Sequence, residues 1–177
     1  MRDRPAHAPA LYAGLFGIGP ALVAIILAFS VTCVSAKASS TDREKMAAYW
    51  GQMADLYSQA LGDATSAFQD GNDRSVTANY LENCSTVARV ATQRLDSADA
   101  PAGWDDVKEK LRSGFSDLAT RCEDAKTHLY SGADANRDKA RSSTTATPRD
   151  LRAALHLARL HYMASGGSGS DLRLAGT

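Results

Sequence analysis

The sequence predicts an all-α protein: an antiparallel helical bundle of three long helices with a shorter C-terminal helix, preceded by a signal peptide or a single transmembrane anchor. Three observations lead to this prediction. Apolar residues recur at steps of three and four over long stretches, which is typical of helices that bury one face. Glycine and proline separate these stretches. An uncharged apolar run comes before all of them.

The apolar run forms the centre of a leader, residues 1–36. Arg2 and Arg4 precede residues 11–34, which contain no charged residue. Small residues at the end of the leader suit signal peptidase, so we predict cleavage between Ala36 and Lys37. The run is also long enough to cross a bilayer as a helix, since about 20 apolar residues suffice. A cleaved signal peptide and a retained membrane anchor therefore both remain open.

Both alternatives place the same part of the chain outside the cytoplasm. Basic residues at the start of a leader keep the N-terminus inside, so residues 37–177 are expected to be extracytoplasmic: secreted, periplasmic or membrane-anchored. A lipoprotein acylated at Cys33 is a third alternative, although residues 30–32 depart from the usual lipobox. Cleavage after Ala36 leaves two cysteines, an even number that suits a disulfide in an oxidising compartment.

Those two cysteines lie symmetrically about a predicted turn. Cys84 falls in a helical pattern at about 73–98, and Cys122 falls in another at about 104–130. The midpoint of their separation is Gly103, which follows Pro101 in the connecting segment. In an antiparallel hairpin, residues equidistant from the turn lie at the same height. We therefore predict a Cys84–Cys122 disulfide within the domain formed by residues 37–130.

The first long helix is predicted at about 42–70. Thr41 and Glu44 form a predicted capping box. In it, the Thr41 side chain accepts a hydrogen bond from the backbone amide of Glu44, and the Glu44 side chain accepts one from the backbone amide of Thr41. Gly71 ends the pattern, because glycine readily takes the left-handed conformation at a helix end. The predicted buried face consists of Met46, Tyr49, Met53, Leu56, Tyr57, Ala60, Ala64, Ala67 and Phe68.

The two helices of the hairpin have similar apolar stripes. The stripe of the first consists of Val76, Tyr80, Cys84, Val87, Ala91, Leu95 and Ala98. The stripe of the second consists of Trp104, Val107, Leu111, Phe115, Leu118, Cys122, Ala125 and Leu129. Each cysteine therefore lies on the face expected to be buried.

The remaining sequence predicts a linker, a helix and a tail. Residues 131–146 have no apolar periodicity and read as a linker. A C-terminal helix is predicted over 147–165, with Thr147 as N-cap and Pro148 at the first helical position. Residues 166–177 are rich in glycine and serine and read as a flexible tail.

Charge is balanced overall but uneven along the chain. The chain has 20 basic and 20 acidic residues, which gives no support to nucleic-acid binding. Residues 41–106 have 5 basic against 11 acidic residues, and residues 107–177 have 12 against 8. We interpret the two parts as helix faces that attract each other; a binding face is the alternative.

No residue pattern specifies a reaction. His156 and His161 are five positions apart and so do not share a helical face as a zinc-binding pair would. Met46 or Met53 could in principle ligate a haem together with His128, but methionines on an apolar stripe are usually core residues. The sequence therefore predicts no catalytic residue, no cofactor and no metal site.

The predicted function follows from the compartment and the architecture. We expect a non-enzymatic accessory or protein-interaction module of the cell envelope, whose partner is another envelope protein. If the leader is retained, residues 11–34 also contact the membrane. The alternative is a carrier of a ligand, haem or metal inside the bundle, as in some four-helix proteins.

Overall fold

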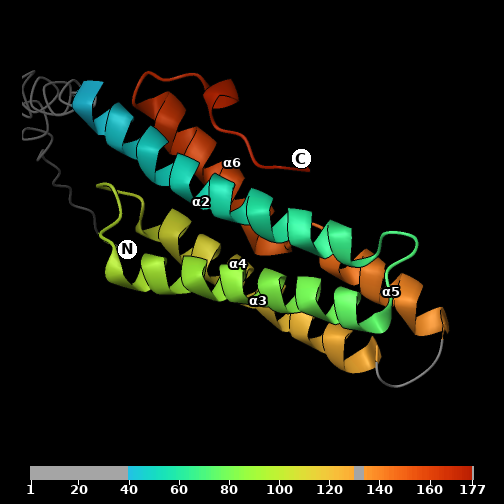
Figure 1. The fold of residues 1–177 in the computed structure, drawn as a ribbon. Helices are drawn as coiled ribbons and strands as arrows, with labels where there is room; N and C mark the ends of the chain where they lie inside the picture. The colour runs from blue at the N-terminus through green and yellow to red at the C-terminus, as the bar shows by residue number, and fades with distance from the viewer. Residues whose placement is uncertain (1–39, 130–133, 177) are drawn as a thin grey trace, which may run out of the picture. The chain divides into compact units, whose positions relative to one another are not determined.

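A computed structural model describes residues 40–129 and 134–176, and it confirms the all-α class. The described residues contain no strand (Figure 1). Their helices are α2 (Ser40–Ala67), α3 (Arg74–Ser97), α4 (Asp105–Leu129), α5 (Asp134–Thr145), α6 (Arg149–Ala164) and the 3-10 helix η1 (Gly169–Asp171).

Helices α3 and α4 are central to the packing. Helix α3 packs against both α2 and α4, and α4 also contacts α5 and α6 on its other sides. Short turns join α2 to α3 and α3 to α4, so neighbouring long helices run antiparallel (Figure 1). The hairpin predicted around Gly103 is thus present.

Two glycines shape these turns. Gly71 and Gly103 have φ angles of 88° and 78°, which glycine adopts without steric cost. The amide of Trp104 donates to the carbonyl of Pro101 at 2.9 Å and closes the second turn. At the first turn, the Asp73 side chain accepts from the amide of Val76 at 2.8 Å and caps α3.

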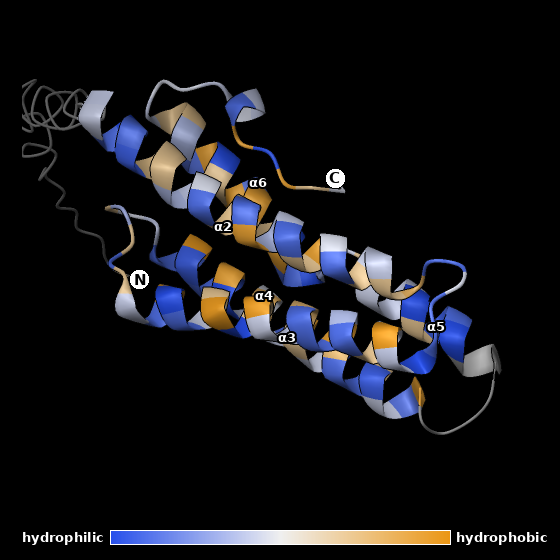
Figure 2. Ribbon diagram, viewed as in Figure 1, coloured by the Kyte–Doolittle hydropathy of each residue, from blue (hydrophilic) through white to orange (hydrophobic). Residues whose placement is uncertain are grey.

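The core lies along the predicted faces of α2 and α4. All predicted stripe residues of these two helices are buried, except for Leu56 and Leu129, which are half-buried. Trp50, which lies beside the predicted stripe, is also buried. Figure 2 shows hydrophobic and hydrophilic residues on different sides of the same helices. The 3.6-residue period therefore identified these two faces well.

The predicted face of α3 needs correction. Val76 and Ala98 are exposed, and Tyr80 and Val87 are only half-buried. The residues actually buried are Thr77, Ala78, Leu81, Cys84, Ser85, Ala88, Ala91 and Leu95. Because α3 packs between two helices, its buried arc is wide, and small side chains there allow close approach on both sides. The larger Tyr80 and Val87 lie at the edge of that arc.

The predicted N-caps of two helices are also wrong. Thr41 lies inside α2 and not before it. Helix α6 begins at Arg149, so Pro148 occupies the N-cap position and Thr147 lies outside the helix. The hydroxyl of Thr147 accepts a hydrogen bond from Tyr57 Oη at 3.0 Å. Its side chain therefore ties the start of α6 to α2.

Residues 131–146, predicted as a linker, contain helix α5. Ala140 and Thr144, one helical turn apart, are buried. The Thr144 hydroxyl donates to the Ala140 carbonyl at 2.9 Å, which satisfies it within the helix. Arg121 of α4 donates to the Ser143 carbonyl at 3.2 Å. Small side chains and these polar contacts replace the missing apolar stripe, which is why the sequence pattern did not reveal the helix.

Residues 166–176, predicted as a flexible tail, pack against the core. Leu172 and Leu174 are buried among residues of α2, α4 and α6. The indole nitrogen of Trp50 donates to the Arg173 carbonyl at 2.8 Å, and Arg159 Nε donates to the Leu172 carbonyl at 3.0 Å. The alternation of leucine with polar residues is typical of an extended segment with one buried side.

We expect Leu172→Ala to lower the free energy of unfolding by about 2 to 3 kcal/mol, since a buried leucine is replaced and a cavity remains. Urea denaturation followed by circular dichroism measures the change. The matched control is Leu160→Ala on α6, where the side chain is 46% exposed. That control should change the stability by less than about 0.5 kcal/mol. Equal effects of the two substitutions would show that the tail does not stabilise the fold.

Candidate functional site

A disulfide joins the two central helices. Cys84 of α3 and Cys122 of α4 are bonded, with their Cα atoms 6.3 Å apart, as the sequence predicted. Both residues are fully buried. The bond therefore fixes α3 and α4 relative to each other from the interior side.

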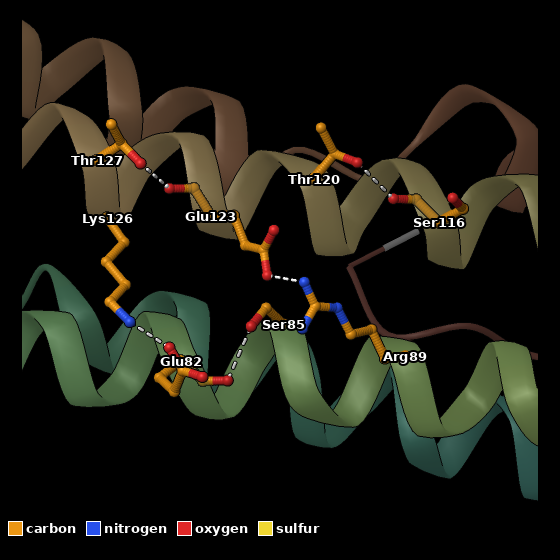
Figure 3. A network of polar contacts seen from close by, with 8 residues as sticks. All are labelled: Glu82, Ser85, Arg89, Ser116, Thr120, Glu123, Lys126 and Thr127. Carbon is orange, nitrogen blue, oxygen red and sulfur yellow. Dashed lines mark hydrogen bonds and ion pairs between the residues drawn. The ribbon is translucent and has the colours of Figure 1, made fainter.

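Oppositely charged side chains connect the exposed sides of the same two helices. Arg89 of α3 pairs with Glu123 of α4, and Glu82 of α3 pairs with Lys126 of α4 (Figure 3). All four side chains are substantially exposed, so each pair contributes little to stability. Their hydrogen bonding nevertheless orders the surface, and the Lys126 ammonium lowers the pKa of Glu82.

A third pair extends this surface toward the turn. Arg112 Nε of α4 lies 2.6 Å from the Asp96 carboxylate of α3. In two of the three pairs, the acid comes from residues 41–106 and the base from residues 107–177. The expected attraction between the acidic and basic parts of the chain is therefore present as specific contacts between helices.

The surface that carries these pairs, which we call the stapled face, has two shallow depressions of about 390 and 250 Å³. Hydroxyl groups between the ion pairs bond to their own helices: Thr120 donates to the Ser116 carbonyl and Thr127 to the Glu123 carbonyl, both at 3.0 Å (Figure 3). The depressions are lined by Glu82, Arg89, Thr92, Gln93, Ser116, Ala119, Thr120, Glu123, Lys126 and Thr127. The stapled face is thus polar, ordered and of mixed charge.

A larger pocket lies between the first turns of α2 and the segment that connects α3 to α4. We call it the end pocket; its volume is about 540 Å³. It is lined by Asp42, Lys45, Met46, Ala48, Tyr49, Gln52, Asp99, Ala100, Pro101 and Ala102. Its walls therefore combine apolar groups with two carboxylates and one amine.

Two buried polar atoms lie beside the end pocket without a hydrogen-bond partner among the described residues: the hydroxyl of Tyr49 and the indole nitrogen of Trp104. The two rings meet edge to face, with their centroids 6.2 Å apart. Burial, followed by the negative charge of Asp105, raises the pKa of Tyr49 to about 12. Unpaired buried polar groups are uncommon in folded proteins and often mark a missing water or ligand.

Next to these rings, α4 and α6 are connected by a histidine. His161 Nε2 lies 3.2 Å from both carboxylate oxygens of Asp106, and its ring centroid is 6.5 Å from that of Trp104. Burial acts to raise the pKa of Asp106, but the hydrogen bonds from His161 and the Val107 amide lower it overall. His161 therefore holds α6 beside the first turn of α4.

Among the residues that the structure describes, the other histidines and methionines do not gather into a site. Met46 and Met53 are buried in the core, whereas His128 lies in the last turn of α4, on its exposed side. Met46 lines the end pocket beside the turn before α4. About 24 helical residues, or roughly 36 Å, separate that turn from His128. The structure therefore does not bring Met46 and His128 together as haem ligands. His156 is exposed on α6.

Within residues 40–129 and 134–176, no group of three or more histidine, cysteine, aspartate or glutamate residues is placed to hold a metal. The described helices also include none that is both long and apolar enough to span a bilayer. The predicted cleavage site at Ala36 and Lys37, and Cys33, lie outside the described residues.

The fold and the two surfaces define a class: an all-α protein with an internal disulfide, a polar stapled face and an end pocket. Compared with known proteins, the chain matches no family model, no curated protein and no solved structure.

Proposed function

We propose that the protein is a non-enzymatic, extracytoplasmic helical bundle that binds another protein of the cell envelope through the stapled face. One observation carries the proposal: the two helices joined by the buried disulfide are also joined, on their exposed sides, by ion pairs. A surface that is already ordered loses little conformational entropy on binding, which favours recognition.

The mixed charges suggest what kind of surface the partner presents. Arg89 and Lys126 alternate with Glu82 and Glu123 over neighbouring turns, so a matching partner needs charges of both signs in a fixed arrangement. Such charges contribute more to specificity and association rate than to affinity. A polar, folded protein surface fits this requirement better than a lipid bilayer, whose mobile headgroups hold no charges in a fixed arrangement.

The compartment is part of the proposal. Arg2, Arg4 and the uncharged residues 11–34 support export, with residues 37–177 outside the cytoplasm as a cleaved or membrane-anchored form. A disulfide persists in such an oxidising compartment, whereas the cytoplasm keeps most thiols reduced. The Cys84–Cys122 bond is therefore consistent with export.

The test uses a photo-crosslinking amino acid at Thr120, which is exposed at the centre of the stapled face. The matched control position is Gln59, exposed on α2. In the native host, we expect one defined envelope protein to crosslink from position 120 but not from position 59. The same crosslinks from both positions, or none from position 120, would contradict the proposal.

The double substitution Arg89→Glu/Glu123→Arg separates binding from folding. It reverses both charges but allows the ion pair to form again, so the melting temperature should change by no more than about 2 °C. Crosslinking from position 120 should fall at least about tenfold, because the partner meets each charge with the wrong sign. Undiminished crosslinking by this stable variant would show that the stapled face is not the interface.

A further inference from the structure

We propose that the outer face of α6 docks on an anionic lipid bilayer. We define this face as the exposed side of the helix, formed by Arg149, Arg152, His156, Leu160 and Met163. These residues recur at steps of three and four, so they lie on one side of the helix, whereas its buried side packs against α4. The stapled face contains none of them, so this proposal does not depend on the protein partner proposed above.

The C-terminal half of the outer face exposes two large hydrophobic side chains. Leu160 is 46% exposed and Met163 is 50% exposed, and among the large hydrophobic residues of 40–129 and 134–176 only Val76 is also exposed. Leu160 and Met163 lie about one helical turn apart. A single exposed apolar residue is normal on a protein surface, but two neighbours on one helix form a joint apolar contact. Such a contact suits the boundary between lipid headgroups and acyl chains.

The N-terminal half of the outer face is basic. Arg149 and Arg152 lie in the first turn of α6, where the helix dipole favours anions, so their charges do not help the helix to form. No ion pair joins either guanidinium group to another residue of the described ranges. Asp150, the one acidic residue of α6, instead contacts α4, where it accepts from Ser113 and pairs with Lys110. The outer face therefore has positive charge and no carboxylate of its own.

The tail that borders the outer face leaves this charge unchanged. A Cβ atom added at Gly169 would lie 3.2 Å from Met163 Sδ, so the tail passes beside the apolar half of the face. Asp171 and Arg173 of the tail carry opposite charges. An anionic bilayer offers both features that the outer face needs: phosphate groups that can move toward the arginines, and an apolar layer beneath them. An acidic protein surface would match the arginines alone.

Lipid photo-crosslinking of the natively processed chain tests the contact. A photo-crosslinking amino acid replaces Leu160, and the control position is Thr120, which is exposed on the stapled face. The protein is reconstituted with vesicles of phosphatidylcholine, either alone or mixed equally with phosphatidylglycerol. We expect lipid adducts from position 160 to be at least about fivefold more abundant on the anionic vesicles, with only background from position 120. Equal adducts from the two positions or on the two lipids would overturn the proposal, as would capture of a protein and no lipid from position 160 in native membranes.

Two double variants of equal net charge locate the docking face. Arg149→Gln/Arg152→Gln should lower the adducts from position 160 on anionic vesicles at least about tenfold, since each arginine near such a surface strengthens binding about fivefold. The matched control, Arg74→Gln/Arg94→Gln, removes two exposed charges from α3 and should change them by less than about twofold. All four positions are exposed, so the melting temperatures should stay within about 2 °C of the parent. Equal losses in the two variants would reduce the result to a general charge effect and overturn the assigned face.

Discussion

Replacing both bonded cysteines with alanine should lower the free energy of unfolding by about 4 kcal/mol. The bond closes a loop with a sequence separation of 38 residues, and the chain-entropy model gives this cost for a loop of that size. For a domain of this length, the melting temperature should fall by about 10 to 20 °C. Thermal unfolding of the Cys84→Ala/Cys122→Ala variant measures the change.

Reduction provides the matched control for this prediction. In the presence of a strong reductant, the melting temperature of the wild-type protein should fall toward that of the double variant. The melting temperature of the variant itself should not change with reductant. Because both cysteines are fully buried, the native bond should resist reduction until the helices separate. A loss smaller than about 1 kcal/mol would mean that packing between α3 and α4 holds the hairpin without help from the bond.

Substituting alanine for Gly114 should destabilise the protein by about 2 to 3 kcal/mol through overpacking. A Cβ atom added at Gly114 of α4 would lie 2.6 Å from Leu151 Cγ and 2.8 Å from the Leu151 backbone nitrogen. The leucine side chain can rotate, but the backbone of α6 can only move away. The substitution should therefore accelerate hydrogen exchange in α6, over Leu151–Ala158, more than it does in α3.

The control for this prediction is another helical glycine. A Cβ atom added at Gly62 in α2 meets nothing within 4 Å. Gly62→Ala should therefore stabilise the protein by about 0.5 to 1 kcal/mol, the usual gain from replacing glycine inside a helix. If Gly114→Ala were also stabilising, α6 would not be in close contact with α4.

The long helices could be predicted from the sequence because each has a broad apolar side and a clear stop. Helix α4 is the best case: residues from Trp104 to Ala125 on its predicted stripe are all buried. Helix α5 could not be predicted in this way, since Ala140 and Thr144 are weak signals of burial. Their burial depends on packing against the preceding helix, α4, near Arg121 and Ala125, and no local pattern within α5 describes that contact.

The candidate surfaces were only partly predictable. The symmetry of Cys84 and Cys122 about Gly103 was enough to predict the disulfide. In an antiparallel helical hairpin, residues equally far from the turn along the sequence lie at the same level along the helix axes. The sequence does not indicate the end pocket, although Tyr49 and Trp104 both lie on predicted buried stripes. Their unpaired polar atoms become visible only when α2 meets the turn before α4, and no local pattern describes that contact.

The contact between Trp50 and Arg173 also constrains the order in which the chain can fold. The two residues are 123 positions apart, so this contact around Trp50 cannot form until residue 173 has emerged. Contacts of such long range form slowly, and exposed apolar surface is prone to aggregate in the meantime. Folding intermediates of this protein should therefore expose the apolar surface of α2 around Trp50.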